Sequence, residues 1–171
     1  MKASQVYKDR IDPKRADEKI LDPRKLEALL QTIGPEGVLP LVCSGSSMTP
    51  TFRNNRTILY LRYGKPAAVA SGDVLLFKRT DGTPVLHRVL RIIRRNSRTL
   101  YEMNGDAQNW TETIEETQII GYVVGYRRNG TGDKLVQTSD RFYKLRVRLW
   151  RILMPVRPLL FQLHAMIRIK K

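Results

Sequence analysis

The stretch GDVLLFKRTDGTPVLHRVLRII, residues 72–93, contains two runs of strand-forming residues with a polar turn between them. Valine, leucine, isoleucine and phenylalanine dominate both runs, which is typical of β-strands. Asp81-Gly82 stands between them, and this dipeptide supplies the positive φ angles that a tight hairpin turn requires. The stretch therefore predicts two antiparallel strands joined at Asp81-Gly82.

The same pattern continues on both sides of this hairpin. Short apolar runs bounded by Gly, Asn, Asp or Pro recur along the chain: GVLPLVCS, RTILYLRY, RTLYEMN and QIIGYVVGYRR. They predict a mainly β fold, with one antiparallel β-domain over residues 38–128. Before it, apolar residues at helical spacing lie between Asp22, a good N-cap, and Gly34-Pro35, a stop signal. Residues 1–37 are therefore expected to be a charged lead-in and one short helix.

The C-terminal part carries most of the excess charge. We expect residues 129–140 to be a polar linker and residues 141–171 to form basic amphipathic helices interrupted by Pro155 and Pro158. The net charge of the chain is +15, and residues 141–171 contain nine Lys or Arg and no acid. This composition is typical of helices that lie in a membrane interface and meet anionic lipid. The alternative is that the tail packs on the β-domain.

Two absences limit the expected location. The N-terminus has no apolar run that could serve a secretory signal peptide. The longest charge-free run of the tail, residues 158–167, is too short for a spanning helix, which needs about 20 residues. We therefore expect peripheral association at the cytoplasmic face of a membrane. The single cysteine, Cys43, excludes an internal disulfide.

Residues that could carry chemistry begin with SGSSMTP, residues 44–50. A serine becomes a nucleophile only beside a base that takes its proton. His164 lies in the basic tail, where it fits an interfacial helix. His87 lies in a predicted strand, whose alternation puts Val85, His87 and Val89 on one face, inward or in a cleft wall. An inward histidine can be a base or simply a core residue.

A carboxylate follows in the segment NGDAQN. Asp106 comes directly after a predicted strand, where aspartate is usually a turn former through its own hydrogen bonds. It could equally accept the imidazole proton on the nitrogen that faces away from a serine.

Five segments together resemble a known family. In order, SGSSMTP, GDVLLFKR, VLHRVLRI, NGDAQN and IIGYVVG are similar to the successive sequence boxes of type I signal peptidases, which share a serine peptidase superfamily with the self-cleaving SOS repressors. The match runs from about Leu41 to Tyr126. The string His87-Arg88-Val89 resembles the histidine-base type of archaea and the endoplasmic reticulum, whereas most bacterial members use a lysine. The resemblance implies a signal-peptidase-like β-domain that cleaves signal or leader peptides without a cofactor or metal.

The resemblance also implies roles for single residues. The nucleophile, which precedes a methionine in the family, falls on Ser47, and the general base falls on His87. The aspartate of the family's "GD" box falls on Asp106, which would orient the imidazole.

Supporting roles are less defined. The Ser47 backbone N–H would stabilise the oxyanion, and the candidates for a second oxyanion donor are Ser44 and Ser46. Glu112 is nearest in spacing to a second family aspartate. The "SGxSM" spacing, with Gly45 two positions before the nucleophile, is closer to the repressor branch.

Two other functions remain open. One is a non-catalytic β-domain docked on a membrane, with His87 in the core and Ser47 in a turn. The other is a self-cleaving regulator that binds DNA. Against it, residues 1–37 predict one short helix, too little for a helix-turn-helix module. The expected partners are a peptide or preprotein substrate and an anionic membrane surface met by residues 141–171, with no nucleic acid.

Overall fold

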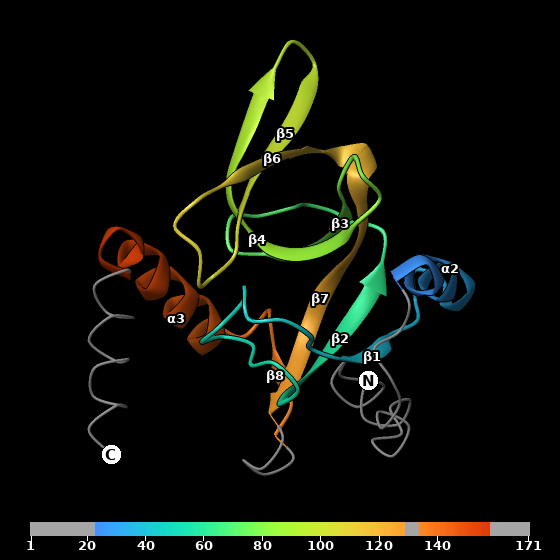
Figure 1. Ribbon diagram of the computed structural model, residues 1–171, viewed down its shortest axis with the longest axis horizontal. Helices are drawn as coiled ribbons and strands as arrows, with labels where there is room; N and C mark the ends of the chain where they lie inside the picture. Colours follow the sequence, from blue (N-terminus) through green and yellow to red (C-terminus); the bar gives the residue numbers. More distant parts are fainter. Residues whose placement is uncertain (1–22, 129–133, 158–171) are drawn as a thin grey trace.

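The computed structural model describes residues 23–128 and 134–157 (Figure 1). Two α-helices are present in these ranges, α2 (Pro23–Ile33) and α3 (Arg141–Ile152), with two 3-10 turns, η2 (Glu116–Gln118) and η3 (Met154–Val156). The strands in chain order are β1 (Leu39–Val42), β2 (Thr57–Tyr63), β3 (Val74–Lys78), β4 (Pro84–Arg95), β5 (Arg98–Asn104), β6 (Glu112–Glu115), β7 (Ile119–Arg128) and β8 (Val136–Gln137).

The strands form one curled antiparallel sheet. Their order is β1-β2-β7-β3-β4-β5-β6, with β8 paired to β7. The mainly β fold is therefore confirmed. Figure 1 shows the sheet wrapping around its own interior, with α2 beside β1 and β2 and α3 on the other side of the molecule.

The predicted hairpin is present as β3 and β4, whose last paired residues are Lys78 and Pro84. Gly82 takes a positive φ of 84°, but Asp81 does not. The reason is the length of the connection, which is longer than a two-residue turn. Asp81 instead closes the turn with its carboxylate, which accepts a hydrogen bond from the Thr83 N–H at 2.8 Å.

Two apolar clusters fill the interior. The larger one lies between the sheet, α2 and α3 and contains Leu26, Leu30, Phe52, Leu61 and Tyr126, among others. The smaller one is centred on β3, β4 and β5, with Leu75, Phe77, Val89, Tyr101, Met103 and Ile114. The smaller cluster contains Val89 and Ile114 and so holds β4 and β6, the strands on which His87 and Glu112 lie.

Two predictions about the C-terminal part change. Residues 129–140 are not only a linker, because Val136 and Gln137 pair with Tyr126 and Gly125 as strand β8. The α3 helix, which begins after Asp140 and ends before Pro155, packs on the β-domain. Its N-cap is Asp140, whose Oδ1 accepts a hydrogen bond from the Phe142 N–H at 2.7 Å.

α3 is buried against the sheet through Tyr143 and Val147. The alternative that the tail packs on the β-domain thus holds for its described part. The Asp22 cap, His164 and the second apolar stripe after Pro158 lie outside the described residues. Within residues 23–128 and 134–157, no helix is long and apolar enough to cross a membrane.

Candidate functional site

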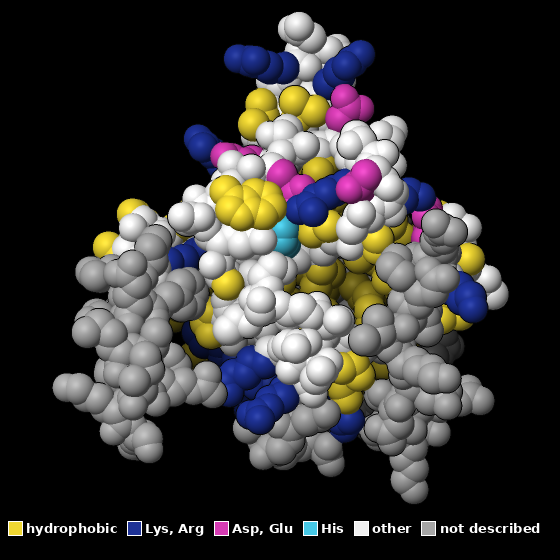
Figure 2. All heavy atoms as spheres, viewed as in Figure 1, with side chains coloured by type: hydrophobic (Ala, Val, Ile, Leu, Met, Phe, Trp, Pro, Cys, Tyr) yellow, Lys and Arg dark blue, Asp and Glu magenta, His cyan; other side chains and the backbone are white. Residues whose placement is uncertain are grey.

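The loop after β1 and the start of β4 both line a cleft of about 280 Å³. Its lining residues come from three segments: Cys43, Ser44, Gly45, Ser47 and Met48 after β1, Arg79 and Pro84–His87 on the β3–β4 hairpin, and Gln108 and Trp110 after β5. In Figure 2 the histidine side chain is a small cyan area on this face, beside hydrophobic, basic and acidic side chains. The structure therefore places Ser47 and His87, predicted to act together, on the walls of one cleft.

His87 is fixed on β4 by its neighbours. Its backbone pairs with Leu75 on β3, and its side chain is only 2% exposed. The imidazole packs edge-on against the rings of Phe77 and Trp110, with centroids 6.1 and 6.0 Å away. Nδ1 lies 2.8 Å from Oε1 of Glu112 on β6. Two aromatic rings and one carboxylate thus hold the imidazole in place.

Glu112 is held in turn by an arginine. Arg79 donates from Nε to Oε2 at 2.6 Å and from Nη2 to Oε1 at 2.8 Å. Burial alone would raise the pKa of Glu112, but the hydrogen bonds and charges of Arg79 and His87 bring it below its ordinary value. Glu112 is therefore ionised at neutral pH and can only accept hydrogen bonds.

The protonation of His87 follows from these contacts. Burial lowers the pKa of the imidazole below its ordinary value, and the nearby Glu112 carboxylate only partly opposes this effect. At neutral pH the ring is therefore neutral. Since an ionised Glu112 must receive a proton, Nδ1 carries the hydrogen and Nε2 carries the lone pair. This tautomer is the one that a general base needs.

The loop that carries Ser47 contacts the turn after β5. The Ala107 N–H donates to the Ser47 carbonyl at 2.8 Å. A Cβ added at Gly105 would lie 2.8 Å from the same carbonyl and 2.5 Å from Oε1 of Gln108. Glycine at position 105 is thus required by the close approach of two backbones. The structure contains no hydrogen bond between the half-buried Ser47 and His87, although both line the cleft.

The other hydroxyls and the thiol near Ser47 separate into different positions. Ser44 is exposed and lines the cleft, whereas Ser46, also exposed, does not line it. Cys43 lines the cleft too, but burial raises its pKa to about 11. Its thiol therefore stays protonated at neutral pH, which makes Cys43 a poor competing nucleophile.

Asp106 does not contact His87, which corrects the predicted orienting role. Its carboxylate accepts from Arg88 Nε at 2.8 Å and Nη2 at 2.6 Å, and both side chains are buried. A buried guanidinium needs such a partner, because an unpaired charge in the interior is strongly unfavourable. The carboxylate that contacts the imidazole is Glu112.

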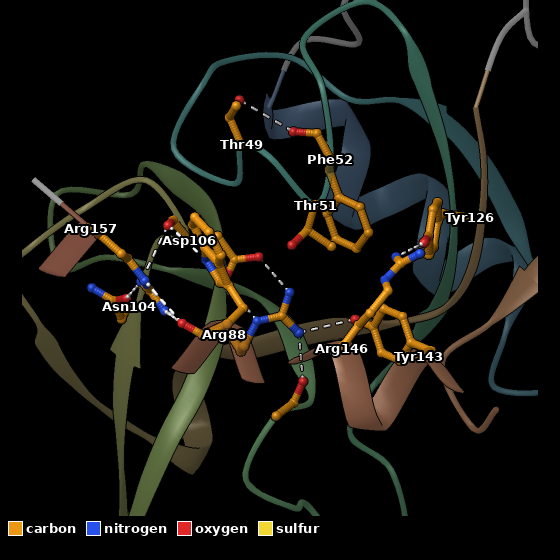
Figure 3. A network of polar contacts seen from close by, with 12 residues as sticks. Thr49, Thr51, Phe52, Arg88, Asn104, Asp106, Tyr126, Tyr143, Arg146 and Arg157 are labelled. Carbon is orange, nitrogen blue, oxygen red and sulfur yellow. Dashed lines mark hydrogen bonds and ion pairs between the residues drawn. The ribbon is translucent and has the colours of Figure 1, made fainter. Parts of the chain in front are cut away.

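The back of the Asp106 turn is held by the C-terminal part, as Figure 3 shows. Arg88 donates from Nη1 to the Tyr143 hydroxyl at 3.0 Å. The Asp106 carbonyl accepts from Trp150 Nε1 at 3.1 Å and from Arg157 Nη1 at 3.2 Å. These contacts were not predicted, because nothing in the sequence indicates which face of α3 meets the sheet.

Within the described ranges, no three His, Cys, Asp or Glu side chains come together as metal ligands. A search against protein-family models and a search against curated proteins found no match to this chain. Any functional assignment therefore rests on the site.

Proposed function

We propose that the protein is a serine endopeptidase of signal-peptidase type, with Ser47 as nucleophile, His87 as general base and Glu112 as the residue that orients the base. The observation that carries the proposal is the His87–Glu112 contact in the cleft that Ser47 also lines. A buried, neutral histidine whose free nitrogen carries the lone pair is suited to take a serine proton at neutral pH.

The reaction follows the usual logic of a serine, a base and an orienting carboxylate. His87 Nε2 takes the Ser47 proton while Oγ attacks the scissile carbonyl carbon. The imidazolium then gives this proton to the leaving amine as the peptide bond breaks. Water, deprotonated by His87, hydrolyses the ester on Ser47 and restores the serine. Glu112 stays ionised throughout and stabilises the imidazolium.

The oxyanion needs donors at the same loop. The Ser47 N–H is the candidate for the first donor, because it belongs to the nucleophilic residue itself, and such a donor contributes about 3 to 4 kcal/mol in known enzymes. Ser44 is the candidate for a second donor, because it lines the cleft and Ser46 does not.

The cleft suits an extended peptide. Residues 84–87 of β4 pair with β3 on one side, while β5 pairs with β4 only from Arg88 onward. β1 is likewise an edge strand, and the residues directly after it line the same cleft. Two strand edges with unpaired ladder positions thus flank the site, and a substrate can add its backbone there as a further strand. A signal or leader peptide of extended conformation is the substrate class that we propose.

Cleavage of a signal-peptide-like substrate by purified variants tests the proposal. We expect turnover by the wild-type protein and a loss of about 10³-fold or more in kcat for Ser47→Ala and for His87→Ala. Ser46→Ala is the matched control, because this exposed serine stands next to Ser47 but does not line the cleft. Unchanged turnover in either dyad variant would overturn the assignment, and so would equal loss in the control.

A further inference from the structure

The α3 helix turns its apolar stripe away from the protein. The structure exposes eight large hydrophobic side chains in its described ranges, and six of them lie in residues 142–156. Phe142 is 73% exposed and Ile152 is 67% exposed. We call the exposed apolar residues of α3 the outward stripe: Phe142, Leu145, Leu149 and Ile152. The opposite face, with Tyr143, Val147 and Trp150, holds the sheet and the Asp106 turn.

Cations lie along one side of this stripe. At 3.6 residues per turn, the four stripe positions span an arc of about 80°, and Arg141, Arg148 and Lys144 follow directly beside it. With Arg151, these three line a cavity of about 510 Å³ between α3 and the loop of residues 70–73. The cavity therefore combines four cations with direct access to an apolar surface.

The cavity has unbalanced positive charge. Its one acid is Asp73, whose Oδ2 already accepts a hydrogen bond from the Ala70 N–H at 2.8 Å. Arg151 donates from Nη2 to the Leu90 carbonyl, but its buried Nε has no hydrogen-bond partner among the described residues. Burial, followed by the charges of Arg88 and Arg148, lowers the pKa of Arg151. A bound anion would relieve this repulsion.

We propose that α3 docks the protein on an anionic phospholipid surface, with the outward stripe among the acyl chains and lipid phosphates in the cationic cavity beside it. Burial of the stripe supplies the apolar contribution, and each cation near an anionic surface adds an electrostatic contribution. The proposal is independent of the peptidase activity.

Other occupants fit this surface less well. A second copy of the chain would bring two cationic faces together, because residues 134–157 contain seven Lys or Arg and only one acid, Asp140. A nucleic acid could meet the cations but offers no apolar medium for side chains as exposed as Phe142. A lipid surface offers phosphates to the cationic cavity and an apolar medium to the outward stripe.

Docking would also orient the cleft. Trp150 and Arg157 connect α3 to the Asp106 carbonyl, and the next residue, Ala107, donates to the Ser47 carbonyl. The site is therefore held at a fixed position relative to the proposed membrane surface. The negative cytoplasmic leaflet is the natural target of such a cationic helix.

Flotation of the full chain with vesicles tests the proposal. The vesicles are phosphatidylcholine alone, or phosphatidylcholine mixed with phosphatidylglycerol. We expect binding to the mixed vesicles at low salt and much weaker binding to the neutral ones. The variant Leu145→Gln/Leu149→Gln should bind about tenfold more weakly or worse. The variant Lys144→Glu/Arg148→Glu should bind the mixed vesicles about thirtyfold more weakly or worse.

The matched control is Arg94→Glu/Arg95→Glu, at the exposed end of β4 and far from α3 in Figure 1. It changes the net charge by the same amount and should lose far less binding than the α3 charge variant. Circular dichroism confirms that each variant is folded, and Phe142→Ser at the most exposed position repeats the test should a double variant unfold.

Several results of the vesicle experiment would overturn the proposal. They are equal binding to neutral vesicles, equal loss in the Arg94 and Arg95 control, and full binding by the α3 variants. Absence of wild-type binding to the mixed vesicles also contradicts it. So does a wild-type protein that does not bind vesicles but changes its oligomeric state in the stripe variant, since the stripe would then contact a second copy of the chain.

Discussion

Strand geometry at single residues decides which carboxylate lies beside His87. His87 and Arg88 are consecutive on β4, so their side chains point to opposite faces of the sheet. Asp106 lies on the Arg88 side, and Glu112 lies on the His87 side. The sequence gives the order of these residues but not their faces, because Glu112 reaches the ring only through the pairing of β6 with β5. The resemblance assigned the orienting role to Asp106, but the carboxylate that contacts the imidazole is Glu112.

Glu112→Gln should change both the rate and its pH dependence. Burial is the larger effect on the pKa of His87, and Glu112 opposes it, so removal of this charge lowers the pKa further. In the proposed mechanism, activity requires the neutral imidazole and is lost as pH falls through the His87 pKa. In the wild type this acid limb should lie below about 6.5, the ordinary histidine value. In Glu112→Gln it should move to lower pH, and kcat should fall by about 10²-fold or more.

The measurement is a pH profile of kcat/KM for the wild type and for Glu112→Gln. Glu102→Gln is the matched control, because Glu102 pairs with Arg91 at the surface of the neighbouring strand, away from the cleft. An acid limb that moves to higher pH, or stays in place with full activity, would contradict the assigned role of Glu112.

At the scale of elements, the turn after β5 joins the Ser47 loop to the C-terminal helix. Its front contacts Ser47 through Gly105 and Ala107, and its back is held by Trp150 and Arg157. The helical period predicted α3, but the docked face could not be predicted. It combines two aromatic residues, Tyr143 and Trp150, with a single aliphatic one, Val147, whereas a pattern search looks for a stripe of aliphatic residues on the buried side. The most apolar side of the helix is the exposed one.

The buried Arg88–Asp106 pair should be critical for this arrangement. Removal of one partner leaves an uncompensated charge, so Arg88→Met or Asp106→Leu should each lower the free energy of unfolding by about 3 to 5 kcal/mol. The double variant should lose less than the two single losses added together, because no unpaired charge remains.

Denaturant unfolding of the four proteins measures this coupling. Arg91→Met is the control, because Arg91 lies on β4 like Arg88 and pairs with Glu102 on β5, but is exposed, so its loss should change stability far less. Additive losses in the double variant would contradict the view that Arg88 and Asp106 stabilise the turn as a pair.

At the scale of the molecule, the sequence predicts the architecture better than the connections. The apolar runs predicted β1 to β5 and β7, since alternation and turn residues are local signals, but they did not include β6 (Glu112–Glu115). β8 was missed because Val136–Gln137 is too short to show a period and forms only by pairing with β7. The details of the cleft were not predicted either, because Arg79, directly after β3, contacts Glu112 on β6, and two strands of the sheet, β4 and β5, come between these strands.

The central claim is that Ser47 is a nucleophile activated by His87, and active-site labelling tests it most directly. A fluorophosphonate forms a phosphonate ester with an activated serine and releases fluoride, and mass spectrometry of the digested protein identifies the labelled residue. We predict labelling at Ser47, with a rate reduced by about 10²-fold or more in His87→Ala. Labelling at another serine instead, or at Ser47 with an unchanged rate in His87→Ala, would contradict the account.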